Sequence, residues 1–95
     1  MRSPLLIRLY ATLRQRAGTR DVEVAWREGA SVGDALRQLL ERQPALDGYV
    51  LDPHGRVVPY VSVFVDGRDI RHLDGLATPV GEDDEIAVFP PVAGG

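Results

Sequence analysis

The last two residues of the chain, Gly94 and Gly95, are the candidates for chemistry in this sequence, because they place a C-terminal carboxylate on an unbranched segment. Glycine has no Cβ that would obstruct a narrow channel, and it accepts almost any backbone angle. The preceding Pro90 and Pro91 fix φ and favour an extended stem. Residues 90–95 reach about 20 Å when extended. Such a segment can enter another protein's active site while the folded body stays outside.

A terminal glycine pair also occurs as a frayed chain end, so the pair alone leaves both interpretations open. The composition is more informative. The sequence has no cysteine, and therefore no thiol nucleophile, no persulfide of its own and no thiolate metal site. All eleven basic residues are arginines, so no lysine is present to accept an isopeptide bond. If the protein handles sulfur, another group must carry it. We expect Gly95 to be the working terminus, without prior proteolysis.

Other side chains offer no catalytic arrangement. His54 and His72 fall in a predicted turn and a loop, without the spacing of a metal site. The acidic run at 82–85 lacks the spaced ligands of a calcium loop, and Gly29–Asp34 lacks the lysine of a phosphate-binding loop. The hydroxyl side chains have no triad partners. We therefore expect no metal site and no independent enzyme, which leaves the carboxylate of Gly95.

At 95 residues the chain has room for one domain, expected at residues 1–89, with residues 90–95 as a tail. No apolar stretch is long enough to cross a bilayer, and Arg8 interrupts the apolar start too early for a signal peptide. We expect a cytoplasmic protein that does not bind membranes. The formal net charge is −3, with arginines and acids interleaved, which argues against nucleic-acid binding.

Periodic apolar residues predict a sheet of four or five strands. The longer strands are expected at Leu5–Ala11, Asp21–Trp26, Tyr60–Val65 and Glu85–Phe89. Asp66 and Gly67 supply a tight turn into a short fifth strand. A short helical turn is expected at Thr12–Ala17, and Gly18 ends it.

The clearest element is a helix that begins after Ser31. Ser31 is a good N-cap, Asp34 stands at the third helical position, and Pro44 ends the helix. Its apolar stripe consists of Ala35, Leu36, Leu39 and Leu40. One helix can cover only one face of the sheet, so an α+β architecture with the helix on a single face is expected.

The other face of the sheet is unusually apolar for a solvated surface. Strand alternation places four residues there: Leu6, Tyr10, Phe64 and Phe89. Tyr60 has the same parity as Phe64. A docking surface is one interpretation. A shifted strand parity, or cover by the loop after Ile70, is the alternative.

Three segments resemble the MoaD/ThiS family of ubiquitin-like sulfur carriers, which includes the small subunit of molybdopterin synthase. They are Ile7–Arg14 with Ala17-Gly18, Ala30–Leu36, and Asp84–Gly95. The similarity runs over essentially the whole chain and is most specific in its closing segment. It implies a β-grasp fold, in which the first and last strands lie side by side at the centre of the sheet and the C-terminal tail projects freely.

The same resemblance implies a mechanism. An enzyme of the ubiquitin-activating type would use ATP and Mg²⁺ to adenylate Gly95, and sulfur from a cysteine desulfurase or a rhodanese-like donor would displace AMP. The thiocarboxylate would then serve an acceptor enzyme, such as the large subunit of molybdopterin synthase or a cysteine synthase. The chain itself would bind no cofactor. It would be a carrier and co-substrate rather than an enzyme, although it can be counted as the small subunit of a synthase.

The candidate site residues follow from this mechanism. Gly95 carries the reactive carboxylate, and Gly94 threads with it through narrow channels. The candidate partner contacts are the stem residues Phe89, Pro90, Pro91, Val92 and Ala93 and the face residues Phe64, Tyr10 and Leu6.

The segment Tyr60–Arg71 departs from the shortest molybdopterin-synthase subunits. It is similar to a longer branch, which contains sulfur carriers for cysteine synthesis and small archaeal-type protein modifiers. Three hypotheses therefore stay open. The chain is a sulfur carrier, or a modifier that forms isopeptides with lysines of other proteins, or an interaction module whose tail takes no part in chemistry.

Overall fold

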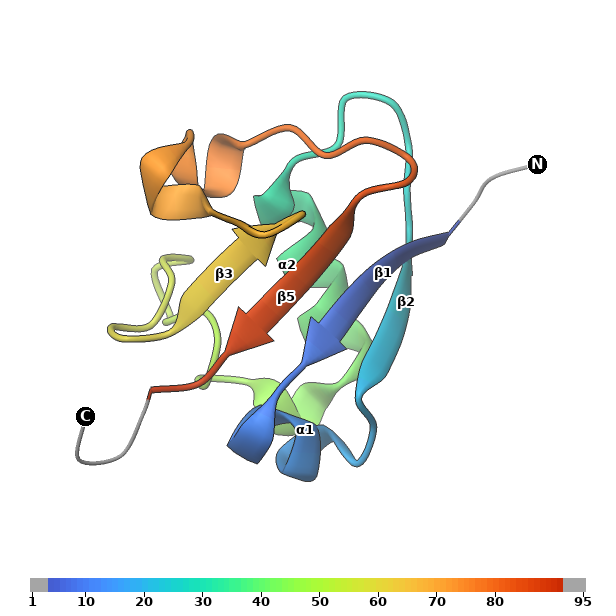
Figure 1. Cartoon of the computed structure of the whole chain (residues 1–95). Coiled ribbons are helices and arrows are strands. Elements are labelled where there is room, and N and C mark those ends of the chain that lie inside the picture. Colours follow the sequence, from blue (N-terminus) through green and yellow to red (C-terminus); the bar gives the residue numbers. More distant parts are fainter. Residues whose placement is uncertain (1–3, 92–95) are drawn as a thin grey trace.

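The computed structural model describes residues 4–91, which form a mixed five-stranded sheet with a long helix behind it (Figure 1). The strands are β1 (Pro4–Leu9), β2 (Asp21–Ala25), β3 (Ser62–Val65), β4 (Arg68–Asp69) and β5 (Glu85–Phe89). The α-helices are α1 (Ala11–Ala17) and α2 (Val32–Arg42). Short 3-10 helices are η1 (Pro44–Leu46), η2 (Ile70–His72) and η3 (Gly75–Ala77).

The strand order is β2-β1-β5-β3-β4, so the first and last strands are neighbours at the centre of the sheet. β1 and β5 run parallel, in a register that pairs Leu6 with Glu85 and Leu9 with Val88. The other neighbouring strands are antiparallel. With α2 packed on one face, this is the β-grasp arrangement, and the predicted fold class is confirmed.

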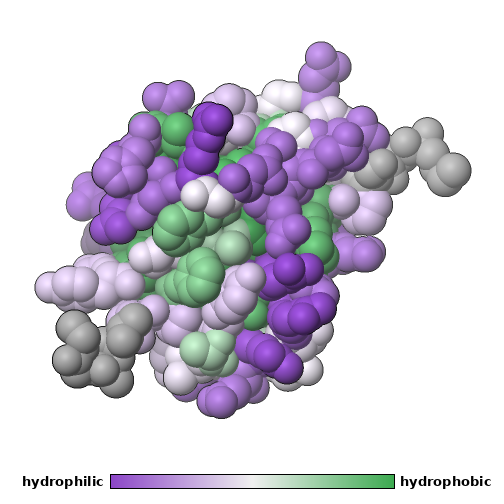
Figure 2. Space-filling view, in the orientation of Figure 1, coloured by the Kyte–Doolittle hydropathy of each residue, from purple (hydrophilic) through white to green (hydrophobic). Residues whose placement is uncertain are grey.

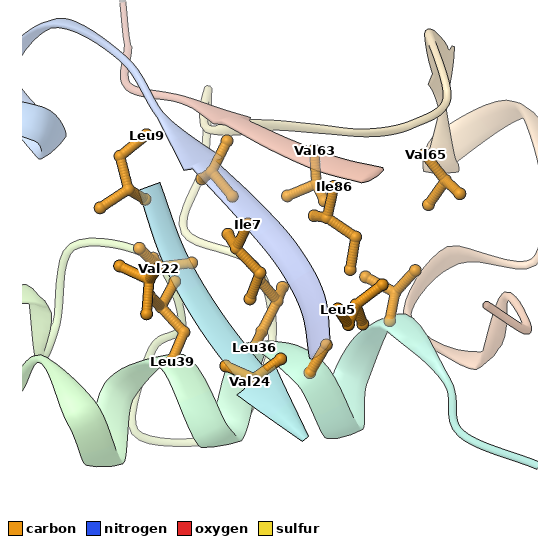
Figure 3. Close-up of a cluster of buried hydrophobic side chains, with 14 of the residues drawn as sticks. Leu5, Ile7, Leu9, Val22, Val24, Leu36, Leu39, Val63, Val65 and Ile86 are labelled. Atoms are coloured by element: carbon orange, nitrogen blue, oxygen red, sulfur yellow. The ribbon is translucent and has the colours of Figure 1, made fainter. Parts of the chain in front are cut away.

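Alternation within the strands sends one set of side chains toward α2, where they form the core. Figure 3 shows side chains of β1 and β2 meeting Leu36 and Leu39 of α2. The buried side chains from the strands include Leu5, Ile7, Leu9, Val22, Val24, Val63, Val65, Ile86 and Val88. The predicted parity is therefore confirmed within each of the longer strands, except at ends that lie outside them.

The N-terminus of α2 lies where the sequence predicts it, because local hydrogen bonds fix it. The Asp34 N–H donates to Ser31 Oγ at 3.2 Å, and the Ser31 N–H donates to Asp34 Oδ2 at 3.0 Å. This reciprocal pair is a capping box. The backbone hydrogen bond from Ser31, followed by the Arg37 guanidinium, holds the pKa of Asp34 below its ordinary value. The helix ends at Arg42, before Pro44.

The predicted end of the first strand is wrong. β1 ends at Leu9. Alternation over the predicted strand would place Ala11 on the core face with Leu9, but Ala11 is an exposed residue at the start of α1. Its φ of 50° turns the chain out of the sheet. α1 ends at Ala17 as predicted, and Gly18 follows with a φ of 77°.

Two further strand ends differ from the prediction. β2 ends at Ala25, and the indole of Trp26 instead donates a hydrogen bond to the Val80 carbonyl at 2.8 Å. β3 begins at Ser62, whereas Tyr60 lies in the preceding turn with a φ of 68°. The prediction that Tyr60 shares the sheet face of the strand is therefore wrong.

Candidate functional site

Three aromatic side chains, Tyr10, Phe64 and Phe89, form a cluster on the sheet face that α2 leaves uncovered. The rings of Tyr10 and Phe89 stack with their centroids 4.2 Å apart and their planes 12° apart. Phe64 meets Phe89 edge to face, at 5.5 Å and 82°. Contacts of both kinds stabilise aromatic pairs. All three residues are only half-buried, so this aromatic cluster is accessible from outside.

The sheet brings these rings together from three segments that are far apart in the sequence. Phe89 pairs with Ser62 across β5 and β3. Beyond the end of β1, the Tyr10 N–H donates to the Val88 carbonyl at 3.3 Å and extends the parallel pairing by one residue. Phe89 is the last residue of β5. The aromatic cluster therefore lies where the chain leaves the sheet toward Pro90 (Figure 1).

The space-filling view shows this face directly. In Figure 2, hydrophobic residues gather over the central strands and hydrophilic residues surround them. An accessible apolar patch with a polar rim is typical of a protein-binding surface. The predicted use of this face as a docking surface is consistent with that distribution of residues and stays a prediction.

Leu6 lies on the same face but apart from the aromatic cluster, because Arg8 of β1 stands between Leu6 and the position of Tyr10 beyond the strand end. The Arg8 guanidinium bridges two strands. Its Nε donates to Asp21 Oδ1 at 3.1 Å on β2, and its Nη1 lies 3.3 Å from Glu85 Oε1 on β5. The hydrogen bond from Arg8 holds the pKa of Asp21 below its ordinary value. The predicted face residues thus form an aromatic end, a charged middle and a separate leucine.

Strand alternation also predicts that Arg8 lies on this face, but sequence reasoning did not predict its ion pairs. The charge partners of Arg8 depend on which strands are neighbours. The resemblance predicts that the first and last strands are adjacent, and that adjacency brings Arg8 close to Glu85. The signal was therefore present in the predicted strand order.

The stem begins immediately after the aromatic cluster. Pro90 is half-buried and Pro91 is exposed. The remaining predicted tail residues, Val92, Ala93, Gly94 and Gly95, lie outside the described residues, and their roles stay predictions.

The described residues bring no cluster of potential metal ligands together. Residues 4–91 hold no group of three or more His, Cys, Asp or Glu side chains that could bind a metal ion. No helix in that range is long and apolar enough to cross a membrane. Every buried side-chain polar atom within it has a hydrogen-bond partner, so none is left unpartnered toward a ligand.

Known proteins are similar to this chain in sequence and in fold. The model of the ThiS family matches residues 7–95. Small archaeal modifier protein 3 of Haloferax volcanii is 41% identical over 91 residues, which cover 96% of this chain and 98% of that relative. Sulfur carrier protein CysO of Mycobacterium tuberculosis is 29% identical over 69 residues, covering 70% of this chain and 74% of that relative. The crystal structure of SAMP1 from Haloferax volcanii matches with a TM-score of 0.87 and 34% identity, covering 98% of this chain and 100% of that chain.

The matched region contains both the aromatic cluster and the terminal glycines. Small archaeal modifier protein 3 and SAMP1 are covered almost completely, so the similarity is not confined to one motif. The resemblance predicted from the sequence is confirmed, and the chain belongs to the ThiS family.

Proposed function

We propose that this protein is a sulfur carrier whose Gly95 carboxylate is converted to a thiocarboxylate. The observation that carries the proposal is the position of the aromatic cluster, because Phe89 ends β5 within it and the chain continues from there to the terminal glycines. A partner bound to the cluster receives the tail at the same time. Relatives named as a sulfur carrier and as a modifier protein support this proposal.

The chemistry must activate a carboxylate, which is a poor electrophile because it is negatively charged and lacks a good leaving group. In the first step a Gly95 carboxylate oxygen attacks the α-phosphorus of ATP, and pyrophosphate leaves. In the second step sulfide-level sulfur attacks the carbonyl carbon, the bond to the phosphate oxygen breaks, and AMP leaves. The chain supplies the reacting carbon and its tether, so it is a co-substrate rather than an enzyme.

The other components come from partner proteins. An adenylating enzyme of the ubiquitin-activating type binds ATP and Mg²⁺, and an acceptor enzyme consumes the thiocarboxylate. A desulfurase or rhodanese-like protein carries the sulfur as a persulfide, and a thiol reductant cleaves its S–S bond so that the transferred sulfur ends at the sulfide level. The large subunit of molybdopterin synthase and a cysteine synthase are the acceptor classes we propose. Because the reactions need ATP and reduced sulfur, we place them in the cytoplasm.

Intact-mass spectrometry tests the carrier function. The full chain is incubated with the adenylating enzyme, ATP, Mg²⁺ and the sulfur donor, and its mass is expected to rise by the difference between a sulfur and an oxygen atom. Fragmentation should locate the change at Gly95. A chain lacking Gly95 should gain no sulfur, whereas His54→Ala, at an exposed position without an assigned role, should react like the wild type. The proposal is refuted if the mass of the wild-type chain does not change although the same enzymes form a thiocarboxylate on another carrier protein.

A second function, protein modification, is favoured by the nearly full-length similarity to small archaeal modifier protein 3. It uses the same adenylate: a lysine amine of a target protein attacks the Gly95 carbonyl carbon, and AMP leaves as the isopeptide forms. No arginine or lysine follows Arg71, so trypsin would leave residues 72–95 on the target. An Ala93→Arg variant instead leaves Gly-Gly on the modified lysine. If that variant gains sulfur normally but yields no such remnant in cells, conjugation is excluded and sulfur transfer is not.

A further inference from the structure

The turn before β3 contains a tyrosine where the backbone favours glycine. The Val61 N–H donates to the Val58 carbonyl at 3.1 Å and closes a four-residue turn with Pro59 and Tyr60 at its centre. Tyr60 has a φ of 68°. Proline at the second position and a positive φ at the third are typical of a type II turn, whose third position favours glycine. A bulky L residue is strained in this conformation.

Packing within the protein does not explain this strained tyrosine. The Tyr60 side chain is 86% exposed, compared with 46% for Tyr49 and 37% for Leu73, the other large exposed apolar residues described. An aromatic ring usually stabilises a fold by burying its large apolar surface. Tyr60 buries little, so the fold gains little from keeping it in a strained turn. Strained residues of this kind cluster at functional sites.

Tyr60 lies at the end of the sheet from which the tail leaves. Ser62, two residues after Tyr60, pairs with Phe89, and Pro91 follows Phe89 by two residues. In an antiparallel pair, residues that precede a paired position on one strand lie opposite residues that follow it on the other strand. Tyr60 and Pro91 therefore lie at the same end of the sheet. The four residues after Pro91 extend only about 13 Å. An enzyme that encloses the terminal glycine must therefore bring its surface to this end of the sheet.

An apolar hollow adjoins the tyrosine. Its volume is about 160 Å³, and besides Tyr60 it is lined mainly by Val57, Val58, Pro59, Val61, Val63 and Ile70. Asp69 and Arg71 also line it, as an ion pair of 2.6 Å. Within one small area the surface thus offers a protruding aromatic ring and a recess that accepts an apolar side chain.

We propose that Tyr60 is a specificity-determining contact for the adenylating enzyme that takes up the tail. The ring inserts into an apolar slot beside the entrance to the enzyme's tail channel, and an apolar side chain of the enzyme fills the hollow next to Tyr60. This role rests on the proposed function, because it requires an enzyme that encloses Gly95. It extends the docking surface beyond the aromatic cluster to a residue outside the strands.

A Tyr60→Gly variant tests this role, because glycine removes the ring and the strain together. Its melting temperature is expected to rise, since glycine is the favoured residue at this turn position. Its KM as a substrate in ATP-dependent adenylation is expected to increase about tenfold, the effect of losing one buried aromatic contact, while kcat stays within about twofold. Tyr60→Phe, which keeps the ring, should retain a KM close to that of the wild type.

Leu73→Ala provides a matched control. It removes another exposed apolar side chain, beside Val65 and Asp66 at the opposite end of β3, and should leave KM unchanged. A Tyr60→Gly variant with the wild-type KM overturns the proposal, whatever its melting temperature. If the wild-type chain itself is not adenylated, the proposed function fails instead. The two failures are therefore distinguishable in one set of assays.

Discussion

At the scale of single residues, Asp66 suits the backbone geometry of its turn, but its negative charge is unfavourable there. Asp66 and Gly67 form the turn between β3 and β4 with φ values of 49° and 83°. Two positive φ values are typical of a type I′ turn, for which Asn-Gly is a preferred pair. Asp66 Oδ1 accepts a hydrogen bond from the Glu85 N–H at 3.0 Å. A hydrogen bond between the Asp66 and Asp84 carboxyl groups requires a proton on one of them, and it raises the pKa of Asp66 while it lowers that of Asp84; repulsion between the two negative charges raises the pKa of Asp66 further.

Asp66→Asn is expected to raise the free energy of unfolding at neutral pH. Asparagine keeps an oxygen that accepts the hydrogen bond from the Glu85 N–H, and it suits the turn. It also removes a negative charge beside Asp84. The folded-state pKa of Asp66 lies above the unfolded value, so the ionised side chain destabilises the fold at neutral pH. That penalty disappears as pH falls through the folded and then the unfolded pKa. Urea denaturation should therefore show a larger gain at neutral pH than near pH 3.

Asp52→Asn is the matched control, and its expected effect on the free energy of unfolding has the opposite sign. Asp52 Oδ1 accepts backbone hydrogen bonds from Arg56 at 3.0 Å and from His54 at 2.8 Å, which hold its pKa below the ordinary value. Its stabilising contribution is present above the unfolded pKa and is lost as pH falls through the folded pKa. The substitution should lower stability at neutral pH and have less effect in acid. The same pH dependence in both variants would contradict this account.

At the scale of elements, side chains close the outer edge of β2. This strand is at the edge of the sheet. At one end, the Ala25 N–H donates to Gln38 Oε1 at 3.0 Å and Gln38 Nε2 donates to the Ala25 carbonyl at 2.8 Å. At the other end, Thr19 Oγ1 donates to the Asp21 carbonyl at 3.2 Å. These side chains form hydrogen bonds with backbone groups of β2 that an additional strand would otherwise pair with. Open sheet edges are prone to pairing with strands of other molecules.

Gln38→Ala is expected to lower the free energy of unfolding by about 1 kcal/mol, because two side chain to backbone hydrogen bonds are lost. It should also increase self-association, since the edge of β2 becomes available to a second copy. Urea denaturation and sedimentation velocity over a range of concentrations measure the two effects. Gln15→Ala, at an exposed position in α1, should change neither. Association equal to that of the wild type would show that Gln38 does not protect the edge.

The sequence predicts element types better than element ends, for a physical reason. α2 is fixed by contacts between near neighbours, such as Ser31 with Asp34, and such contacts can be read from a short stretch of chain. Ala11 and Tyr60 adopt positive φ values that their side chains disfavour, so no local pattern predicts them. The aromatic cluster was predicted as residues on one face, but its contacts required the strand order. That order came from the family resemblance rather than from periodicity.

At the scale of the whole molecule, the fold joins the two ends of the chain. The parallel pairing of β1 with β5 connects Leu6 to Glu85 and Leu9 to Val88 across almost the entire sequence. β5 also pairs with β3, so it links both halves of the sheet. The sheet is therefore incomplete until the last strand is in place. The residues after Phe89 follow this strand and add no further strand to the sheet within the part that the structure describes.

A chain that ends at Phe89 is thus expected to keep the unfolding free energy of the full chain within about 1 kcal/mol, because terminal segments with few packed groups contribute little. It should at the same time lose both proposed tail reactions. A chain that ends at Asp84 should not fold, because it lacks the fully buried Ile86 and Val88 and the strand that joins β1 to β3. Urea denaturation followed by circular dichroism compares the three chains. An unfolded chain ending at Phe89 would place the stem within the fold and contradict the predicted boundary between domain and tail.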